Sequence, residues 1–275
     1  MIGLRVGVRI ILMAKPTVIL IGADRGGVGK TTVARTLLDY FNVQKMRVRA
    51  FDTEFPKGNL KRFHPDLTEV VDFTSVDTQI TIFDPLEAPV VPVTVIDVRA
   101  GLMSDMLRTL HDIGFIAAVK RNEVALVLFH VITPTIVSLA ETVDRPSLPD
   151  AKHFMVKNLI TDSAFVESRA SKYHWFKDAV EITVPKLDEM AMEQVEVAAI
   201  PFVNFVGHKA GGPASYSWVL RKYVYNWLVK VWAEYDRVGL THCIMDLQDG
   251  SDQTDKSVVT GRFPMTRQVP TDALR

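Results

Sequence analysis

The most constraining feature of the chain is a glycine-rich stretch at residues 21–32, with the sequence IGADRGGVGKTT. It follows a continuous run rich in β-branched residues at 17–22, which is typical of a strand buried on both faces of a parallel sheet. It leads into a helical pattern at 30–41, where Ala34, Leu38 and Phe41 share one face. A strand, a glycine turn and a helix N-terminus in this order predict a phosphate-binding loop.

The residue types in this loop suit a nucleoside triphosphate with Mg²⁺. Glycines allow successive main-chain N–H groups to approach phosphates without a Cβ in the way. The ammonium group of Lys30 is expected to bridge the β- and γ-phosphates, the hydroxyl of Thr31 to ligate Mg²⁺, and Thr32 to reach the α-phosphate. The predicted nucleotide-binding residues of the loop are Arg25, Gly26, Gly27, Val28, Gly29, Lys30, Thr31 and Thr32.

A second acidic pattern supports this prediction. Residues 93–97, VTVID, are mostly β-branched and end in Asp97. A buried strand that ends in an acid delivers one carboxylate to the Mg²⁺ shell of a P-loop protein, so Asp97 is predicted to be a metal ligand. A strand at 47–52 likewise ends in Asp52, with Glu54 two residues later.

Strand-like and helical stretches alternate along most of the chain, and this pattern predicts βαβ units. The expected fold class is therefore α/β, a three-layer sandwich with a mostly parallel sheet and a P-loop NTPase fold. The segment 163–193 is helical and charged in character and is not assigned further. Expected strands are 17–22, 47–52, 91–98 (starting after Pro92), 124–132, 153–160 and 195–203. Expected helices are 30–41, 103–116, 133–143 and a long helix that follows Gly212-Pro213 and runs to about Arg237.

The glycine loop resembles the deviant Walker A motif of the ParA/MinD family of P-loop ATPases, x-Lys-Gly-Gly-x-Gly-Lys-[Ser/Thr]. The first lysine of that motif crosses a dimer interface to touch the partner's phosphates. This chain has Arg25 at that position and Asp24 where an ordinary Walker A motif has its first glycine. Arginine keeps the charge and can bind phosphate bidentately, so Arg25 is either an arginine finger in trans or a degenerate position.

The resemblance also implies roles outside the loop. The run from Asp52 to Asn59 is similar to the family's Asp-x-Asp-Pro-Gln-Gly-Asn, with Glu54 in place of the second acid and Phe55 as an extra residue. It implies that Asp52 holds the Mg²⁺ shell through water and that Glu54 orients or deprotonates the attacking water. Asn158 and Pro201 match the places at which the family contacts adenine, and Gly101 that of its switch II hinge.

The function implied by the resemblance is a dimerising ATPase. ATP would join two subunits face to face as a homodimer, hydrolysis would part them, and an activating partner protein would trigger turnover in order to partition or position DNA or other cargo. The matrix is non-specific DNA in ParA relatives, for which Lys209, Arg221, Lys222 and Lys230 are candidates, although a solvated helix face explains them equally well. In MinD relatives it is a membrane, bound through a C-terminal amphipathic helix.

Two alternatives stay open on the same scaffold. One is an ATP-dependent small-molecule synthetase or kinase, similar to dethiobiotin synthetase. The other is a nucleotide-binding scaffold with little hydrolysis, which the departures at Arg25 and Glu54 allow. A cluster of the nitrogenase iron-protein type is excluded, because the chain has one cysteine, Cys243.

Composition and the ends of the chain complete the expectations. Lys plus Arg equals Asp plus Glu, so net charge favours neither DNA nor an anionic membrane as partner. The last 16 residues contain two prolines and no apolar stripe, so membrane binding is not expected. A lone cysteine suits a reducing, cytoplasmic location. The expected organisation is a loose extension at 1–12, one P-loop ATPase domain at 13–247, and a flexible tail at 248–275.

Overall fold

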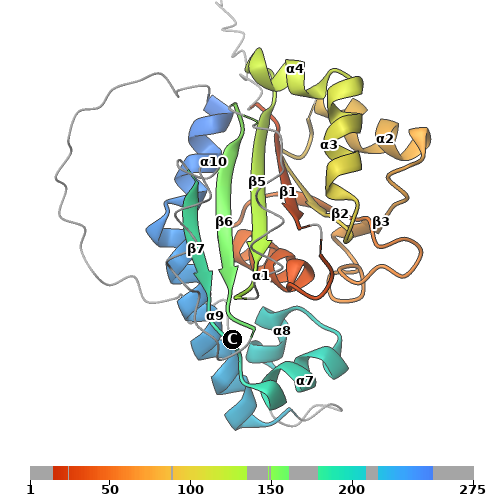
Figure 1. The fold of residues 1–275 in the computed structure, drawn as a ribbon. Coiled ribbons are helices and arrows are strands. Elements are labelled where there is room, and N and C mark those ends of the chain that lie inside the picture. Colours follow the sequence, from red (N-terminus) through yellow and green to blue (C-terminus); the bar gives the residue numbers. More distant parts are fainter. Residues whose placement is uncertain are drawn as a thin grey trace, which may run out of the picture.

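The structure, a computed structural model, describes residues 15–23, 25–87, 89–134, 148, 150–160, 179–208 and 216–249. Seven strands form one sheet in the order β3-β2-β4-β1-β5-β6-β7, and every neighbouring pair is parallel (Figure 1). The strands are β1 (Thr17–Gly22), β2 (Val48–Asp52), β3 (Thr68–Val70), β4 (Val93–Asp97), β5 (Ala125–Ile132), β6 (Lys152–Asn158) and β7 (Val180–Val184).

Helices cover both faces of the sheet, as Figure 1 shows. One face carries α1 (Lys30–Val43), α7 (Glu189–Ala198), α8 (Phe202–Gly207), α9 (Trp218–Arg237) and α10 (Leu240–Asp249). The other carries α2 (Val76–Phe83), the 3-10 helix η1 (Asp84–Leu86), α3 (Met103–Asp112) and α4 (Phe115–Lys120). The expected three-layer α/β sandwich is confirmed, and the sheet is parallel throughout.

Successive side chains of the central strand β1 point to opposite faces of the sheet, and the apolar core therefore has two parts. Ile19 and Ile21 of β1 belong to the cluster under α1 and α7–α10. Val18 and Leu20 belong to the cluster under α2–α4. Because each strand residue points to one of two covered faces, the strand has to be apolar along its whole length, and this explains the continuous run in the sequence.

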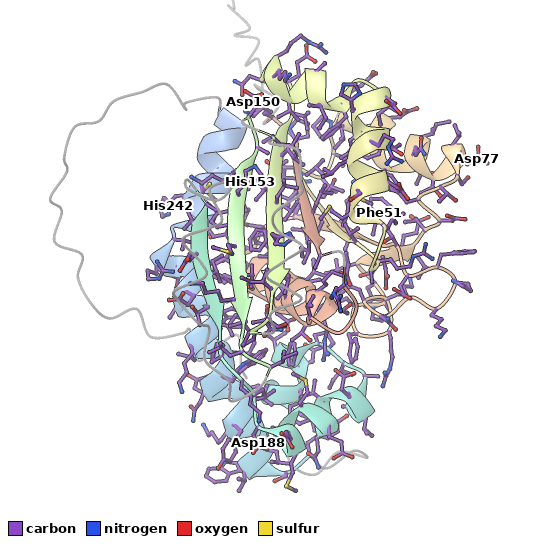
Figure 2. All side chains as sticks on the ribbon, in the orientation of Figure 1. Phe51, Asp77, Asp150, His153, Asp188 and His242 are labelled. Atoms are coloured by element: carbon purple, nitrogen blue, oxygen red, sulfur yellow. The ribbon has the colours of Figure 1, made fainter. Side chains whose placement is uncertain are left out.

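One predicted strand is wrong. Residues 195–203 are not a strand: they hold the end of α7, a turn and the start of α8. The side chain of Asp188, labelled near α7 in Figure 2, caps α7 by accepting a hydrogen bond from the N–H of Ala191 at 3.0 Å. Val195 is then buried and Val197 is 78% exposed, which is the spacing of a helix rather than of a strand covered on both faces.

Several other elements differ from expectation in extent. The helix expected at 103–116 is two helices, α3 and α4, separated at Gly114. The sequence does not indicate strand β3 or helices α2 and α10. The helical interpretation of 163–193 is wrong at 180–184, which form strand β7 beside β6. Helix α9 begins after Ser217, whose hydroxyl accepts from the N–H of Leu220. The helix expected at 133–143 falls almost wholly outside the described residues.

The predicted domain boundaries stay predictions. The extension at 1–12 lies outside the described residues, as does the tail from residue 250 onward. Helix α10 runs to Asp249, so the boundary expected at 247 falls inside a helix. Within the described ranges, no helix is both long enough and apolar enough to cross a membrane.

Candidate phosphate-binding site

The sheet topology brings the predicted loop and the two acids to one edge. Strand β1 lies beside β4, and β4 lies beside β2, with Ile21 in register with Asp97 and Asp97 in register with Asp52. Because parallel strands end at the same edge, both acids lie beside the turn that leaves β1. The order of strands therefore explains why residues 45 positions apart in the sequence share one site.

A cleft of about 220 Å³ lies at this edge. It brings together the loop and all three predicted acids, while Arg25, Val28, Asn158 and Pro201 are not among its lining residues. The lining residues are Gly26, Gly27, Gly29, Lys30, Thr31, Thr32, Asp52, Glu54, Asn59, Asp97, Val98, Arg99 and Ala100.

The loop closes onto the start of α1 through Gly29. This residue is the N-cap of the helix, has φ 88°, and accepts the N–H of Val33 at 3.0 Å. A Cβ at this position would overlap the side-chain amide of Asn158, which itself donates to the carbonyl of Val28 at 2.9 Å. Glycine is thus required both by the backbone angle and by the close approach of β6.

Lys30 spans its own loop. Its ammonium group donates to the carbonyl of Arg25 at 2.8 Å, and the side chain is only 8% exposed. Residues 29–32 at the start of α1 line the same cleft, and a helix N-terminus favours an anion. The loop therefore combines a buried cation with a helix N-terminus.

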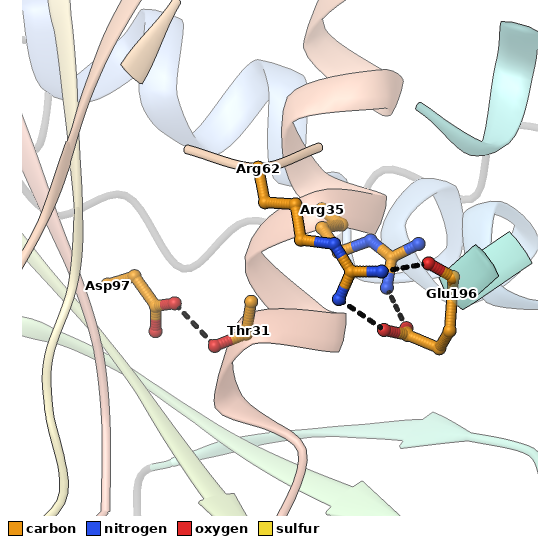
Figure 3. A network of polar contacts seen from close by, with 5 residues as sticks. All are labelled: Thr31, Arg35, Arg62, Asp97 and Glu196. Atoms are coloured by element: carbon orange, nitrogen blue, oxygen red, sulfur yellow. Dashed lines mark hydrogen bonds and ion pairs between the residues drawn. The ribbon is translucent and has the colours of Figure 1, made fainter. Parts of the chain in front are cut away.

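Thr31 and Asp97 form the pair drawn in Figure 3, with the Thr31 hydroxyl donating to Asp97 Oδ2 at 2.7 Å. The other carboxylate oxygen, Oδ1, is buried without a hydrogen-bond partner among the described residues. The pKa of Asp97 is raised to about 7, mainly by burial and also by nearby Asp52, while the Thr31 hydroxyl and Lys30 act in the opposite direction. An orphaned carboxylate oxygen beside a hydroxyl in this cleft would fit a Mg²⁺ shell.

The described residues hold no cluster of three or more His, Cys, Asp or Glu side chains suited to a metal ion. A P-loop site needs no such cluster, because Mg²⁺ keeps several waters and takes oxygens from the nucleotide. The hydroxyl of Thr31 and the carboxylate of Asp97 would therefore suit Mg²⁺ that is also bound by nucleotide oxygens and water.

Asp52 organises the loop that follows β2. Its Oδ1 accepts the N–H of Glu54 at 2.9 Å, and its Oδ2 accepts those of Leu60 at 2.5 Å and Lys61 at 3.2 Å. The N–H of Gly58 donates to the carbonyl of Glu54 at 2.9 Å, and this turn accommodates the extra residue at Phe55. Both oxygens of Asp52 thus bind main-chain amides, and Glu54 is placed at the cleft by this turn.

Sequence reasoning missed Thr53, the residue between the two acids. Its hydroxyl donates to the carbonyl of Asp97 at 3.0 Å and accepts the N–H of Arg99 at 2.7 Å. The side chain is buried and connects the end of β2 to the segment after β4. No pattern in the sequence marks a threonine at this position as a bridge.

Two predicted residues lie beside the site rather than in it. Asn158 at the end of β6 is buried against the loop backbone, as described above. Pro201 is the N-cap residue of α8 and is half-buried. Contact of either residue with adenine stays a prediction. Arg25 is exposed at the rim of the loop, and Asp24 lies outside the described residues.

No protein-family model and no curated protein matches the chain. Solved structures with a similar fold include a ParA family ATPase from Chlorobium tepidum TLS, with 16% identity and a TM-score of 0.49, covering 78% of this chain and 98% of that one. Another is a nucleotide-binding protein in complex with ADP from Archaeoglobus fulgidus, with 15% identity, a TM-score of 0.41, and 66% and 86% of the two chains covered. A third is the MinC:MinD cell division complex of Aquifex aeolicus, with 13% identity, a TM-score of 0.47, and 77% and 94% covered. At these sequence identities and TM-scores, the similarity assigns neither a ligand nor an activity to this chain.

Proposed function

We propose that the chain is a P-loop ATPase that binds Mg-ATP, dimerises in the ATP state and separates after hydrolysis. The observation that carries this proposal is the common cleft of the glycine loop, Thr31, Asp97 and Glu54. These groups supply what phosphoryl transfer needs, which is positioning and charge stabilisation rather than covalent chemistry.

Each side chain has a role that follows from its place. Lys30 exchanges the carbonyl of Arg25 for phosphate oxygens when a nucleotide enters the cleft. Thr31 and Asp97 hold Mg²⁺, which neutralises charge on the phosphates when bound. Glu54, half-buried at the cleft, orients the attacking water. Asp52 acts on this chemistry through the loop that carries Glu54.

The proposal that the chain dimerises rests on the position of Arg25. Its side chain is exposed and is not among the residues lining its own cleft, although it belongs to the phosphate-binding loop. A guanidinium group at this rim is suited to reach the phosphates bound by a second subunit. The proposed assembly is therefore a homodimer that forms across two nucleotide sites, with a partner protein that stimulates turnover.

Non-specific DNA is the proposed matrix. Lys222 and Lys230 are exposed on α9, whereas Arg221 donates to the carbonyl of His208 and Lys209 lies outside the described residues. Two exposed lysines on one helix form a small positively charged surface, and its attraction to DNA phosphates is strongest at low salt. The test is therefore whether duplex DNA stimulates phosphate release at low salt. Lys222→Glu combined with Lys230→Glu is expected to remove that stimulation and to leave the basal rate unchanged.

The experiment that tests the switch is the mass in solution by light scattering, with Mg-ATP and with Mg-ADP, paired with phosphate release. The wild type is expected to be a dimer with ATP and a monomer with ADP. Glu54→Ala is expected to keep the ATP dimer and to lose hydrolysis. Asp66→Ala, an exposed acid of the same loop region, serves as the matched control.

The outcomes separate the alternatives. One mass in all nucleotide states would contradict the switch and favour a synthetase or kinase, which is then assayed by phosphorylation or ligation of small acids. An ATP dimer without phosphate release from the wild type would favour a nucleotide-binding scaffold. Loss of hydrolysis in Asp66→Ala as well would show that the effect of Glu54→Ala is not specific.

A further inference from the structure

A buried guanidinium group lies at the junction of three segments next to the cleft. Arg35, on α1, is 1% exposed. Its Cζ lies 3.4 Å from the ring centroid of Phe63, in the loop after β2, and 4.2 Å from that of Phe202, at the start of α8. The guanidinium of Arg35 therefore lies between two rings from segments far apart in the sequence.

A carboxylate on α7 completes the junction (Figure 3). Arg35 Nη1 lies 2.5 Å from Glu196 Oε1. Arg62 donates to the main-chain carbonyl of Glu196, and its Nη1 lies 3.8 Å from Oε2. Glu196 is thus bound from α1 and from the loop after β2, so the end of α7 is tied to both.

The loop after β2 is held at two points. At the cleft, Asp52 accepts the N–H groups of Glu54, Leu60 and Lys61. At the other end, Phe63 covers the guanidinium of Arg35. Through Asp52, residues 60 and 61 are thus connected to the turn that places Glu54.

The segment that leads into α8 is held at the same junction. Phe202 directly follows Pro201, and the N–H of Val203 donates to Asp39 Oδ2 at 3.3 Å. Asp39 lies on α1, one turn after Arg35. Helix α1, which begins at the phosphate loop, therefore contacts two sets of residues: those predicted to cover the base and those that place Glu54.

Burial of the Arg35 guanidinium between the two rings carries a desolvation penalty. Nε and Nη2 of Arg35 find no hydrogen-bond partner within the described ranges, and burial lowers the pKa of the guanidinium. An apolar side chain of similar length would fill the gap between the rings without the desolvation penalty. Buried ionic groups stabilise weakly, and their best-attested role is to fix how elements are placed relative to one another.

We propose that Arg35 is a positioning residue that couples the base-covering segment, residues 196–203, to the loop that carries Glu54, residues 54–63. The proposal rests on the proposed function, since it needs a nucleotide whose base and phosphates reach both segments. Binding of the base then sets the position of Glu54, so ATP orders the loop more than a triphosphate without a base does.

The test is hydrogen exchange measured by mass spectrometry on wild type and Arg35→Met. Three states are compared: no ligand, Mg²⁺ with inorganic triphosphate, and Mg²⁺ with a non-hydrolysable ATP analogue. In the wild type, the analogue is expected to slow exchange in residues 54–63 more than triphosphate does. In Arg35→Met the two ligands should act equally on that loop. An extra protection by the analogue that survives in Arg35→Met would overturn the proposal.

Companion variants guard against a general loss of structure. Glu196→Gln weakens the same junction at a side chain that is 42% exposed, and its matched control is Glu193→Gln, one turn earlier on α7 and exposed. Glu196→Gln is expected to lower kcat roughly tenfold with unchanged ADP affinity, because the phosphate loop is intact. Arg35→Lys keeps the charge without the planar fork and should recover only part of the coupling. Equal kcat for Glu196→Gln and Glu193→Gln would count against the proposal.

Failure of the proposed function is distinguishable from failure of the coupling. If neither triphosphate nor the analogue binds, the ATPase proposal fails. The comparison without ligand still decides on Arg35: the substitution to Met should raise exchange in residues 54–63 and 196–203 together. Unchanged exchange in either segment would show that Arg35 does not tie them.

Discussion

The hydroxyl of Thr53 donates a hydrogen bond to the main-chain carbonyl of Asp97, at 3.0 Å. The N–H of Thr53 reaches the same carbonyl at 3.1 Å, and the N–H of Arg99 donates to the hydroxyl at 2.7 Å. One buried side chain thus connects the acid-bearing turn after β2 to the segment after β4. The two segments, both of which contribute residues to the cleft, are held together by this bridge.

Thr53→Val keeps the shape of the side chain and removes the bridge. The N–H of Arg99 then lacks a partner, which is expected to cost about 1–3 kcal/mol of unfolding free energy. Phosphate release should fall more than ADP affinity, because the lost contact positions the segments around the γ-phosphate. Urea unfolding and steady-state phosphate release check both effects. Thr53→Ser retains the hydroxyl and should stay close to wild type; a serine variant as impaired as the valine variant would contradict the bridge.

Gly29→Ala tests the close approach of β6 to the phosphate loop. The backbone at φ 88° costs an alanine about 1–2 kcal/mol, and its Cβ also overlaps the amide of Asn158. Gly27→Ala is the matched control, because its φ is 75° and a Cβ there meets no atom within 4 Å. We expect Gly29→Ala to lose more stability than Gly27→Ala in thermal unfolding.

A second substitution separates the two causes. Asn158→Ala in the Gly29→Ala background removes the overlapping amide but leaves the backbone angle unchanged. Stability should therefore recover in part, relative to the sum of the single effects. Strictly additive effects would mean that the two positions do not interact.

Arg25 is predicted to act across the dimer, and subunit mixing tests this directly. Arg25→Ala and Lys30→Ala should each be inactive alone. In a mixed dimer, the subunit with Lys30 intact receives Arg25 from the partner, so phosphate release should return in part. If Arg25 acts within its own subunit, no mixed site is complete and the mixture stays inactive. Glu193→Gln mixed with Lys30→Ala reports the activity contributed by a fully wild-type site.

The phosphate loop and its sheet could be predicted because local rules specify them. The glycine run, the β-branched strand before it and the acid at the end of β4 each depend on nearby residues alone. Right-handed parallel connections limit the possible strand orders, but the order itself comes from the structure alone. The residues lining the cleft on both acid-bearing strands were accordingly found in the sequence, while their chemical roles stay predictions.

Long-range contacts explain what the sequence analysis missed. Thr53 is one threonine among many, and only the pairing of β2 with β4 makes it a bridge. Arg35 looks like an ordinary polar residue of α1 until Phe63 and Phe202 enclose it. The strand predicted at 195–203 was wrong because its β-branched residues outweighed the capping signal of Asp188, seven residues earlier.

The last prediction concerns pH and the buried acid Asp39. Burial raises its pKa to about 7, while the N–H of Val203 and the charge of Arg35 act in the opposite direction. In the unfolded chain this carboxyl releases its proton near its ordinary value of 3.8, whereas the folded chain keeps the proton until about pH 7. The contribution of Asp39 to stability is therefore fully present below about pH 4 and is lost as pH rises through 7.

Asp39→Asn removes this titration. Relative to wild type, the variant should gain stability between pH 5 and pH 8, by about 3 kcal/mol, because about two of the three pKa units of the shift lie above pH 5. His64, whose pKa is lowered to about 4 by burial and by Arg35, lies 3.9 Å from Asp39 and contributes with the opposite sign. Because the two side chains are in contact, the same comparison in a His64→Gln background separates their contributions. Urea unfolding of both proteins at pH 5 and pH 8 measures the difference in stability, with the exposed Asp77→Asn as control. A difference that does not change with pH would show that Asp39 is already ionised in the folded chain at pH 5.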